Sequence, residues 1–151
     1  MFNCQIHPKV SRCLLAFLLL SLTVMGSLAA ALPVQAADYV PLKGNFTGAG
    51  ANFAGNFSHL GKVQGVVDAT TFTALWTAAN GDTVTNQTTS FVVGEEVTPD
   101  VHRYEQSIVI TGGTGRFANA TGSATVTGLI NLVTGAYDGK LIGTISRPNR
   151  G

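Results

Sequence analysis

Alternating apolar and polar positions run along the chain in short segments separated by glycine- or asparagine-rich turns. The alternation is clearest in residues 71–78, where one face carries Phe72, Ala74, Trp76 and Ala78. Because successive side chains of a β-strand point to opposite faces, this pattern predicts a half-buried strand. No segment beyond the N-terminal leader sustains a period of about 3.6 residues, so helices are not expected.

Similar segments predict further strands at spacings of about ten residues. These strands cover residues 63–69, 83–93, 102–111, 123–132 and 137–146. The repeated Asn-Phe-x-Gly at Asn45 and Asn52 indicates two short strands or one sharply kinked strand.

Three local features predict interruptions. Asn80-Gly81 indicates a type I′ hairpin turn, because that turn needs positive φ at both central residues. Pro41 has no backbone N–H and is expected to prevent regular pairing in the extended lead-in, residues 37–43. Residues 94–101 contain two glutamates, a proline and an aspartate, so they are predicted to form a surface loop.

Seven or eight sequential strands joined by short loops predict an antiparallel meander. Closing such a meander into a barrel removes its vulnerable edges. The predicted fold is therefore all-β, a single antiparallel barrel of seven or eight strands. A sandwich of two sheets is the alternative, and the pattern of strands alone leaves it open.

Residues 1–36 are predicted to be a signal peptide. A basic start precedes an apolar stretch at residues 14–25, and a Val-Gln-Ala cleavage sequence ends at Ala36. A retained membrane anchor is the alternative, but glycine, serine and proline interrupt the apolar stretch, whereas a spanning helix needs about 20 apolar residues. Cleavage would leave one domain, residues 37–151, that is secreted or periplasmic and has no stable membrane span.

Charge and cysteine content restrict the function of this domain. Without Lys9 and Arg12 of the leader, seven Lys and Arg remain against eight Asp and Glu, a net charge of −1. No basic patch is present, so nucleic-acid binding is not expected. Both cysteines lie in the leader, which leaves the domain no disulfide and no thiolate metal site. His59 and His102 show no metal-ligand spacing, so no metal ion is expected.

The most distinctive segment is Ile110-Thr-Gly-Gly-Thr-Gly-Arg-Phe-Ala-Asn-Ala-Thr-Gly122. Its four glycines predict a tight turn and a compact loop between two antiparallel strands. The segment resembles the allene oxide cyclase and dirigent barrel superfamily, in which a strand runs into Gly-Gly-x-Gly-x-Phe and returns after another glycine. Residues 77–83 and 143–146 also resemble small exported bacterial relatives with that barrel.

The resemblance implies an eight-stranded barrel whose apolar lumen shapes a small hydrophobic molecule. Members of the superfamily steer ring closures, orient radical coupling or accelerate a cycloaddition, and none needs a metal or an organic cofactor. The resemblance also implies a homo-oligomer assembled through the outer faces. No functional residue of the plant cyclases can be matched to a position of this chain.

The densest ionisable run in a predicted strand supplies weak catalytic candidates. Alternation puts His102 and Tyr104 on one face and Arg103 and Glu105 on the other. If Glu105 faced the lumen, desolvation would raise its pKa and make it a general acid or base. In the alternative reading, Arg103 and Glu105 face solvent and Tyr104 shares the apolar face with Ile108.

Large side chains are the candidates for contacting a ligand. They are Phe72, Trp76, Phe91 and Tyr104 in the strands, with Arg116 and Phe117 in the glycine loop. As lumen residues they would line a pocket, and as core residues they would fill it. The loop pair has two readings. In one, it is a lid whose Arg116 meets an anionic ligand; in the other, Phe117 plugs the barrel end and Arg116 caps carbonyls or an acid.

The leading functional hypothesis is a secreted small β-barrel protein that binds a small hydrophobic ligand in its lumen. One alternative is a cofactor-free cyclase or isomerase of the allene oxide cyclase type. Another is a structural protein of the cell envelope with a packed barrel and no ligand. The residues alone do not decide among these three.

Overall fold

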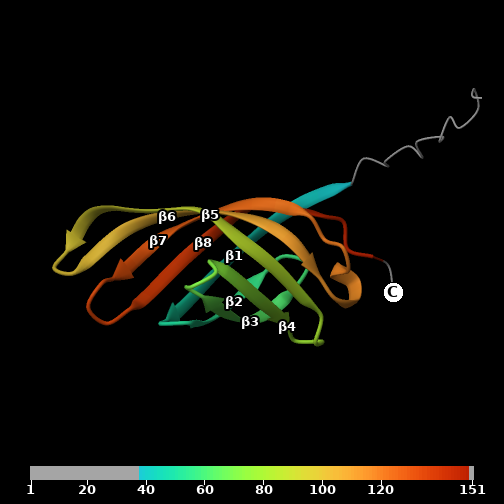
Figure 1. Cartoon of the computed structure of the whole chain (residues 1–151), viewed down its shortest axis with the longest axis horizontal. Coiled ribbons are helices and arrows are strands. Elements are labelled where there is room, and N and C mark those ends of the chain that lie inside the picture. The colour runs from blue at the N-terminus through green and yellow to red at the C-terminus, as the bar shows by residue number, and fades with distance from the viewer. Residues whose placement is uncertain (1–37, 150–151) are drawn as a thin grey trace, which may run out of the picture. The chain divides into compact units, whose positions relative to one another are not determined.

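The computed structural model describes residues 38–149, which form a closed eight-stranded antiparallel barrel in which β8 pairs with β1 (Figure 1). The elements are β1 (Tyr39–Ala49), β2 (Asn52–Phe57), β3 (Gly61–Asp68), β4 (Thr73–Ala78), β5 (Thr83–Thr98), β6 (Val101–Gly113), the 3-10 helix η1 (Gly115–Phe117), β7 (Gly122–Asn131) and β8 (Ala136–Ser146). The prediction of a barrel rather than a sandwich is confirmed. The predicted signal peptide lies outside the described residues.

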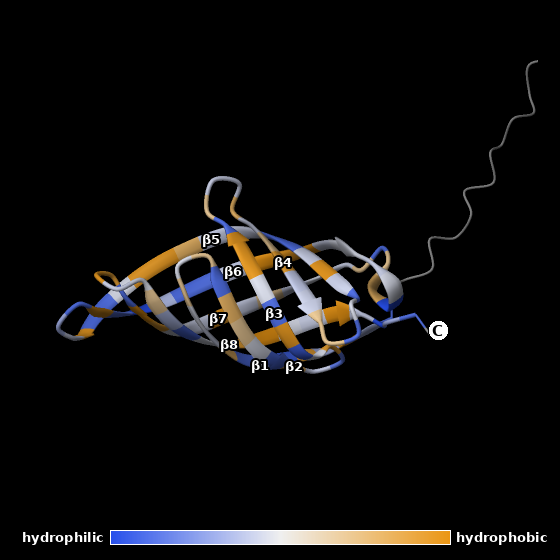
Figure 2. Ribbon diagram, turned by 90° about the horizontal axis from the view of Figure 1, so that it is seen from below, coloured by the Kyte–Doolittle hydropathy of each residue, from blue (hydrophilic) through white to orange (hydrophobic). Residues whose placement is uncertain are grey.

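Sequence alternation sets which side chains enter the barrel. In β4, Trp76 and Ala78 are buried while Leu75 and Thr77 are exposed, as the pattern predicted. Figure 2 shows apolar and polar bands following one another along the strands. Within the described residues, no helix has the length and apolar character needed to cross a membrane.

The repeated Asn-Phe-x-Gly motif forms two strands rather than one kinked strand. β1 and β2 are joined by a turn in which Gly50 has φ of 59°. The turn reverses the chain, so Phe46 and Phe53 both point inward despite their odd spacing. Their ring centroids lie 5.2 Å apart.

Pro41 does not interrupt β1, contrary to the prediction. It lies opposite Thr144 of β8, in the part of β1 that has no register with β2. Its missing N–H therefore removes no ladder bond on the β2 side. The Pro41 carbonyl on that edge accepts a hydrogen bond from Ser58 Oγ (3.2 Å) and lies 3.0 Å from His59 Nε2. Proline is tolerated where a strand has only one partner.

The prediction of a surface loop over residues 94–101 is also wrong. β5 continues to Thr98 and only residues 99–100 form the turn into β6, with φ of 66° at Asp100. The two strands make a long hairpin that extends at the left of Figure 1. Register shifts beside Glu96 and the exposure of residues 89–98 conceal the apolar alternation by which a strand is recognised.

The hairpin between β4 and β5 forms as predicted, but its turn is not type I′. Gly81 N–H donates to the Ala78 carbonyl (2.9 Å), and φ is positive at Gly81 (88°) but not at Asn80. This is the longer hairpin loop in which a turn is followed by one left-handed glycine. The Asn80 side chain instead donates to Asp82 Oδ2 (2.8 Å).

Large aromatic side chains fit inside the barrel because glycines lie opposite them on neighbouring strands. The cross-strand pairs are Phe46–Gly139, Phe53–Gly65, Phe57–Gly44 and Tyr137–Gly48. A Cβ added at Gly65 would overlap the Phe53 ring, and one at Gly44 would overlap the Phe57 ring. Each ring therefore packs directly on the backbone of the adjacent strand.

Gly65→Ala is expected to destabilise the barrel by about 1–3 kcal/mol, because the new methyl group forces the Phe53 ring out of its position. Gly94→Ala is the matched control, since a Cβ there meets nothing closer than 3.6 Å. Urea unfolding followed by tryptophan fluorescence measures both free energies. Equal free energies for the two variants would show that the glycine opposite Phe53 does not matter.

Candidate functional site

A cavity of about 290 Å³ lies inside the barrel, at the end opposite η1. Gly50, Ala69 and Phe72, from the β1–β2 and β3–β4 turns, lie among its lining residues, so these turns border its mouth. The aromatic lining residues are Phe46, Phe53, Phe57, Phe72, Trp76, Phe91, Tyr104 and Tyr137. Phe46, Phe53, Phe57 and Trp76 form a continuous cluster, with neighbouring ring centroids 5.0–6.5 Å apart.

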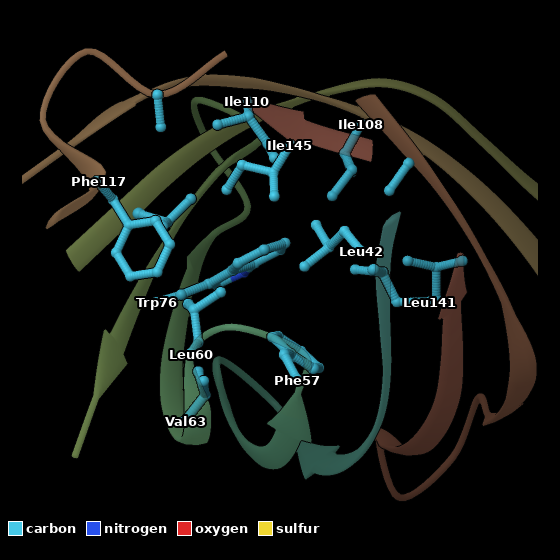
Figure 3. Close-up of a cluster of buried hydrophobic side chains, with 14 of the residues drawn as sticks. Leu42, Phe57, Leu60, Val63, Trp76, Ile108, Ile110, Phe117, Leu141 and Ile145 are labelled. Atoms are coloured by element: carbon cyan, nitrogen blue, oxygen red, sulfur yellow. The ribbon is translucent and has the colours of Figure 1, made fainter. Parts of the chain in front are cut away.

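The other end of the barrel is filled by side chains. Phe117, which is 1% exposed, points inward from η1 toward Trp76 and Leu60 (Figure 3). Aliphatic residues complete this layer: Val40, Leu42, Val63, Val84, Ile110 and Ile145. The cavity is therefore a cup with one closed end.

Polar contacts tie the glycine loop to the turns around it. Arg116 Nε lies 3.1 Å from Asp82 Oδ2, and Arg116 Nη2 donates to the His59 carbonyl (3.3 Å). The hydrogen bond from Asn80 holds the pKa of Asp82 below its usual value, and Arg116 adds to this shift. Phe117 thus plugs the end and Arg116 pairs with an acid, which is the second of the two readings of this loop.

The structure brings four of the six ligand-contact candidates to the cavity. Phe72, Trp76, Phe91 and Tyr104 line it, whereas Arg116 and Phe117 lie at the closed end. Phe91 points inward because the register of β5 shifts between Thr88 and Ser90. That shift changes which alternate positions face the lumen.

The three catalytic candidates are not gathered at one point. Glu105 is exposed on the outer face, and Arg103 beside it pairs with Glu95 (3.1 Å). His102 lies near the hairpin tip, with Nδ1 3.3 Å from the Gly94 carbonyl. Of the three, Tyr104 alone is among the residues that line the cavity.

The two tyrosine hydroxyls of the cavity are already engaged. Tyr104 donates to the Asp138 carbonyl (2.9 Å), and Tyr137 donates to the Asn52 carbonyl (3.3 Å). Burial raises the pKa of Tyr104 above its usual value, and the nearby Asp138 carboxylate adds to the shift. Burial also raises the pKa of Tyr137. Both phenols therefore stay protonated at neutral pH.

Three polar lining residues were not anticipated from the sequence: Asn86, Thr88 and Gln106. Asn86 is 2% exposed and its Nδ2 donates to the Ala74 carbonyl (3.2 Å). Residues 83–90 are almost entirely polar, so no apolar stripe marks the inner face. Asn86 and Thr88 lie two and four residues after Val84, so they share its face of β5. This alternation is the signal that could have revealed both residues.

Charged groups are lacking from the cavity wall: none of its lining residues in the described chain is Asp, Glu, His, Lys or Arg. Residues 38–149 also contain no group of three or more His, Cys, Asp or Glu that could hold a metal ion. The wall offers aromatic surface, amides and hydroxyls. It can therefore bind and orient a molecule through apolar contact and neutral hydrogen bonds.

Phe72 occupies a strained position at the mouth. Its φ is 55°, a left-handed conformation that costs a bulky residue about 1–2 kcal/mol, yet its side chain is 57% exposed. Its carbonyl accepts Thr88 N–H (2.8 Å), which fixes the β3–β4 turn on β5. The strain holds an aromatic ring at the entrance to the cavity.

Comparisons of the chain with protein families, with curated proteins and with solved structures gave no match. The likeness of the glycine stretch to the allene oxide cyclase and dirigent superfamily therefore remains a resemblance.

Tyr104→Phe is expected to lower the free energy of unfolding by about 1 kcal/mol near neutral pH, through loss of the hydrogen bond to Asp138. The folded pKa of Tyr104 lies above the unfolded value of about 10, so its protonated phenol contributes fully below that pH. This contribution decreases as the pH rises above the unfolded pKa and is lost completely above the folded pKa. Urea unfolding near neutral pH and at about pH 11 should therefore show a smaller alkaline loss in Tyr104→Phe. An equal loss in both proteins would contradict this account.

Phe72→Gly is expected to change the free energy of unfolding by less than about 1 kcal/mol. Relief of the left-handed strain offsets the added freedom of glycine in the unfolded chain. Thermal and urea unfolding of the variant and the parent measure the difference. A loss above about 3 kcal/mol, the cost of deleting a core aromatic, would show that the Phe72 ring holds the fold together.

Proposed function

We propose that the protein binds a small hydrophobic molecule in the lumen of its barrel. The observation that carries the proposal is the cavity of about 290 Å³ between the aromatic cluster and the mouth. Packed protein interiors leave few voids larger than a water molecule. A cavity of this size favours a ligand site over a solid structural barrel.

The chemistry of the wall fits an apolar ligand. Aromatic and aliphatic side chains make up most of the lining, with a small number of polar groups on β5 and β6. Binding sites for small molecules commonly combine a mainly apolar concave surface with a few placed polar groups. The lack of charged lining residues disfavours a strongly polar or ionic ligand.

The mouth provides a route for such a ligand. Phe72 and Phe91 both line the cavity and are both about half exposed. An apolar molecule can therefore contact aromatic surface before it is fully inside. A strained, exposed Phe72 adds little to the core, and its place at the entrance is explained by contact with a ligand.

The protein contains one tryptophan, Trp76, which is 3% exposed and lines the cavity. Its fluorescence should report occupancy. Titration of the purified protein with isopropylnaphthalene is expected to give a saturable change with one site per barrel. Absence of any saturable change, by fluorescence or by calorimetry, would contradict the proposal.

Two neighbouring valines of β3 provide matched variants. Val67 lines the cavity, whereas Val66 is 53% exposed on the outer face. Val67→Phe places a ring in the ligand space and is expected to weaken binding of isopropylnaphthalene at least about tenfold, or about 1.4 kcal/mol. Val66→Phe should leave the affinity unchanged. Equal affinities in both variants would indicate adsorption to the outer surface.

A further inference from the structure

Apart from the two tyrosines, the polar side chains of the cavity are gathered on one wall. Asn86 and Thr88 come from β5 and Gln106 comes from β6. In the closed order of eight strands, β5 and β6 lie four positions from β1 and β2. The amides and the hydroxyl therefore lie across the barrel from Phe46 and Phe53.

Asn86 lies at the floor of this polar wall. It lies two residues after Val84 in β5, and Val84 belongs to the packed end of the barrel. Its Nδ2 is oriented by the Ala74 carbonyl, because a carbonyl can only accept. Within the described chain, every fully buried side-chain N or O atom has a partner, and Asn86 Oδ1 accepts no hydrogen bond. This oxygen therefore faces the open space of the cavity, where a ligand can donate to it.

Thr88 and Gln106 continue the wall toward the mouth. Gln106 Nε2 donates to Thr88 Oγ1 (2.7 Å), and both side chains line the cavity. This bond leaves the Thr88 hydroxyl hydrogen and Gln106 Oε1 for a further partner. Together with Asn86, the wall can donate to a carbonyl and accept from a hydroxyl.

The cavity wall of the described chain has no opposite charge that would stabilise an ionic ligand. Within residues 38–149, no charged side chain lines the cavity. Burying an unpaired carboxylate or ammonium group is far more costly than burying a neutral polar group that gains a hydrogen bond. The cavity therefore selects against charge.

We infer that the ligand is an uncharged, mainly apolar molecule carrying one hydroxyl group, which enters first and donates a hydrogen bond to Asn86 Oδ1. The apolar remainder then lies against the aromatic cluster and points to the mouth. This inference rests on the proposed function, and it adds the chemical class and the orientation of the ligand.

Three naphthalene probes of similar size test it: naphthylethanol, isopropylnaphthalene and naphthoate. Calorimetry gives the affinity of each for the parent protein and for Asn86→Leu, an apolar residue of similar volume. The ratio of alcohol affinity to hydrocarbon affinity should fall about tenfold in the variant. Taking the ratio within each protein cancels the different hydrophobicities of the probes. Asn56→Leu, on the exposed face of β2, should leave the ratio unchanged.

Each outcome separates the two proposals. If alcohol and hydrocarbon bind but the ratio of their affinities is the same in Asn86→Leu, the polar floor is overturned while lumen binding stands. Tighter binding of naphthoate than of the alcohol would overturn the preference for uncharged ligands. If none of the three probes binds the parent protein, the proposed function fails and this inference fails with it.

Loss of folding in Asn86→Leu would move the test to Thr88→Val. That variant removes the second polar group of the wall at nearly constant volume. The ratio of alcohol affinity to hydrocarbon affinity is then expected to fall about threefold, since the Thr88 hydroxyl is a secondary contact. An unchanged ratio in a folded Thr88→Val protein would overturn the inference.

Discussion

The packing of aromatic rings on glycines of neighbouring strands is the contact on which the rest of the barrel depends. A glycine inside a strand costs about 0.5–1 kcal/mol, and fully burying a phenylalanine side chain gains about 1.5–3 kcal/mol. The pairs Phe53–Gly65 and Phe57–Gly44 are therefore favourable only as pairs. A larger residue at either glycine would displace the ring into the lumen.

The same packing explains why one end of the barrel is filled and the other is hollow. Rings that rest on β1, β3 and β8 are drawn toward that side of the barrel. Opposite them, β5 and β6 contribute Phe91 and Tyr104 but also three smaller, polar side chains, Asn86, Thr88 and Gln106. At the η1 end, Phe117 enters from a loop and occupies the remaining space. Within residues 38–149, no loop side chain fills the mouth, where Phe72 and Phe91 stay about half exposed.

Sequence alternation predicted the barrel well because its signal is repeated in almost every strand. It failed where local chemistry overrides the pattern. Pro41 keeps its place in β1 because the strand there has one partner, and residues 94–98 pair in an exposed hairpin that buries little. The polar wall was not predicted because burial of Asn86 depends on which face of β5 turns inward. The neighbouring threonines and glutamine make both faces polar, so the sequence does not indicate which face that is.

Two features at opposite ends of one cavity are explained better by a ligand than by folding alone. At the floor, Asn86 Oδ1 accepts no hydrogen bond and faces the open space of the cavity, since every fully buried side-chain N or O atom of the described chain has a partner. A leucine of similar volume would present no polar atom there. At the mouth, the left-handed conformation of Phe72 costs about 1–2 kcal/mol while its ring stays about half exposed. A ligand that fills the cavity would contact both residues.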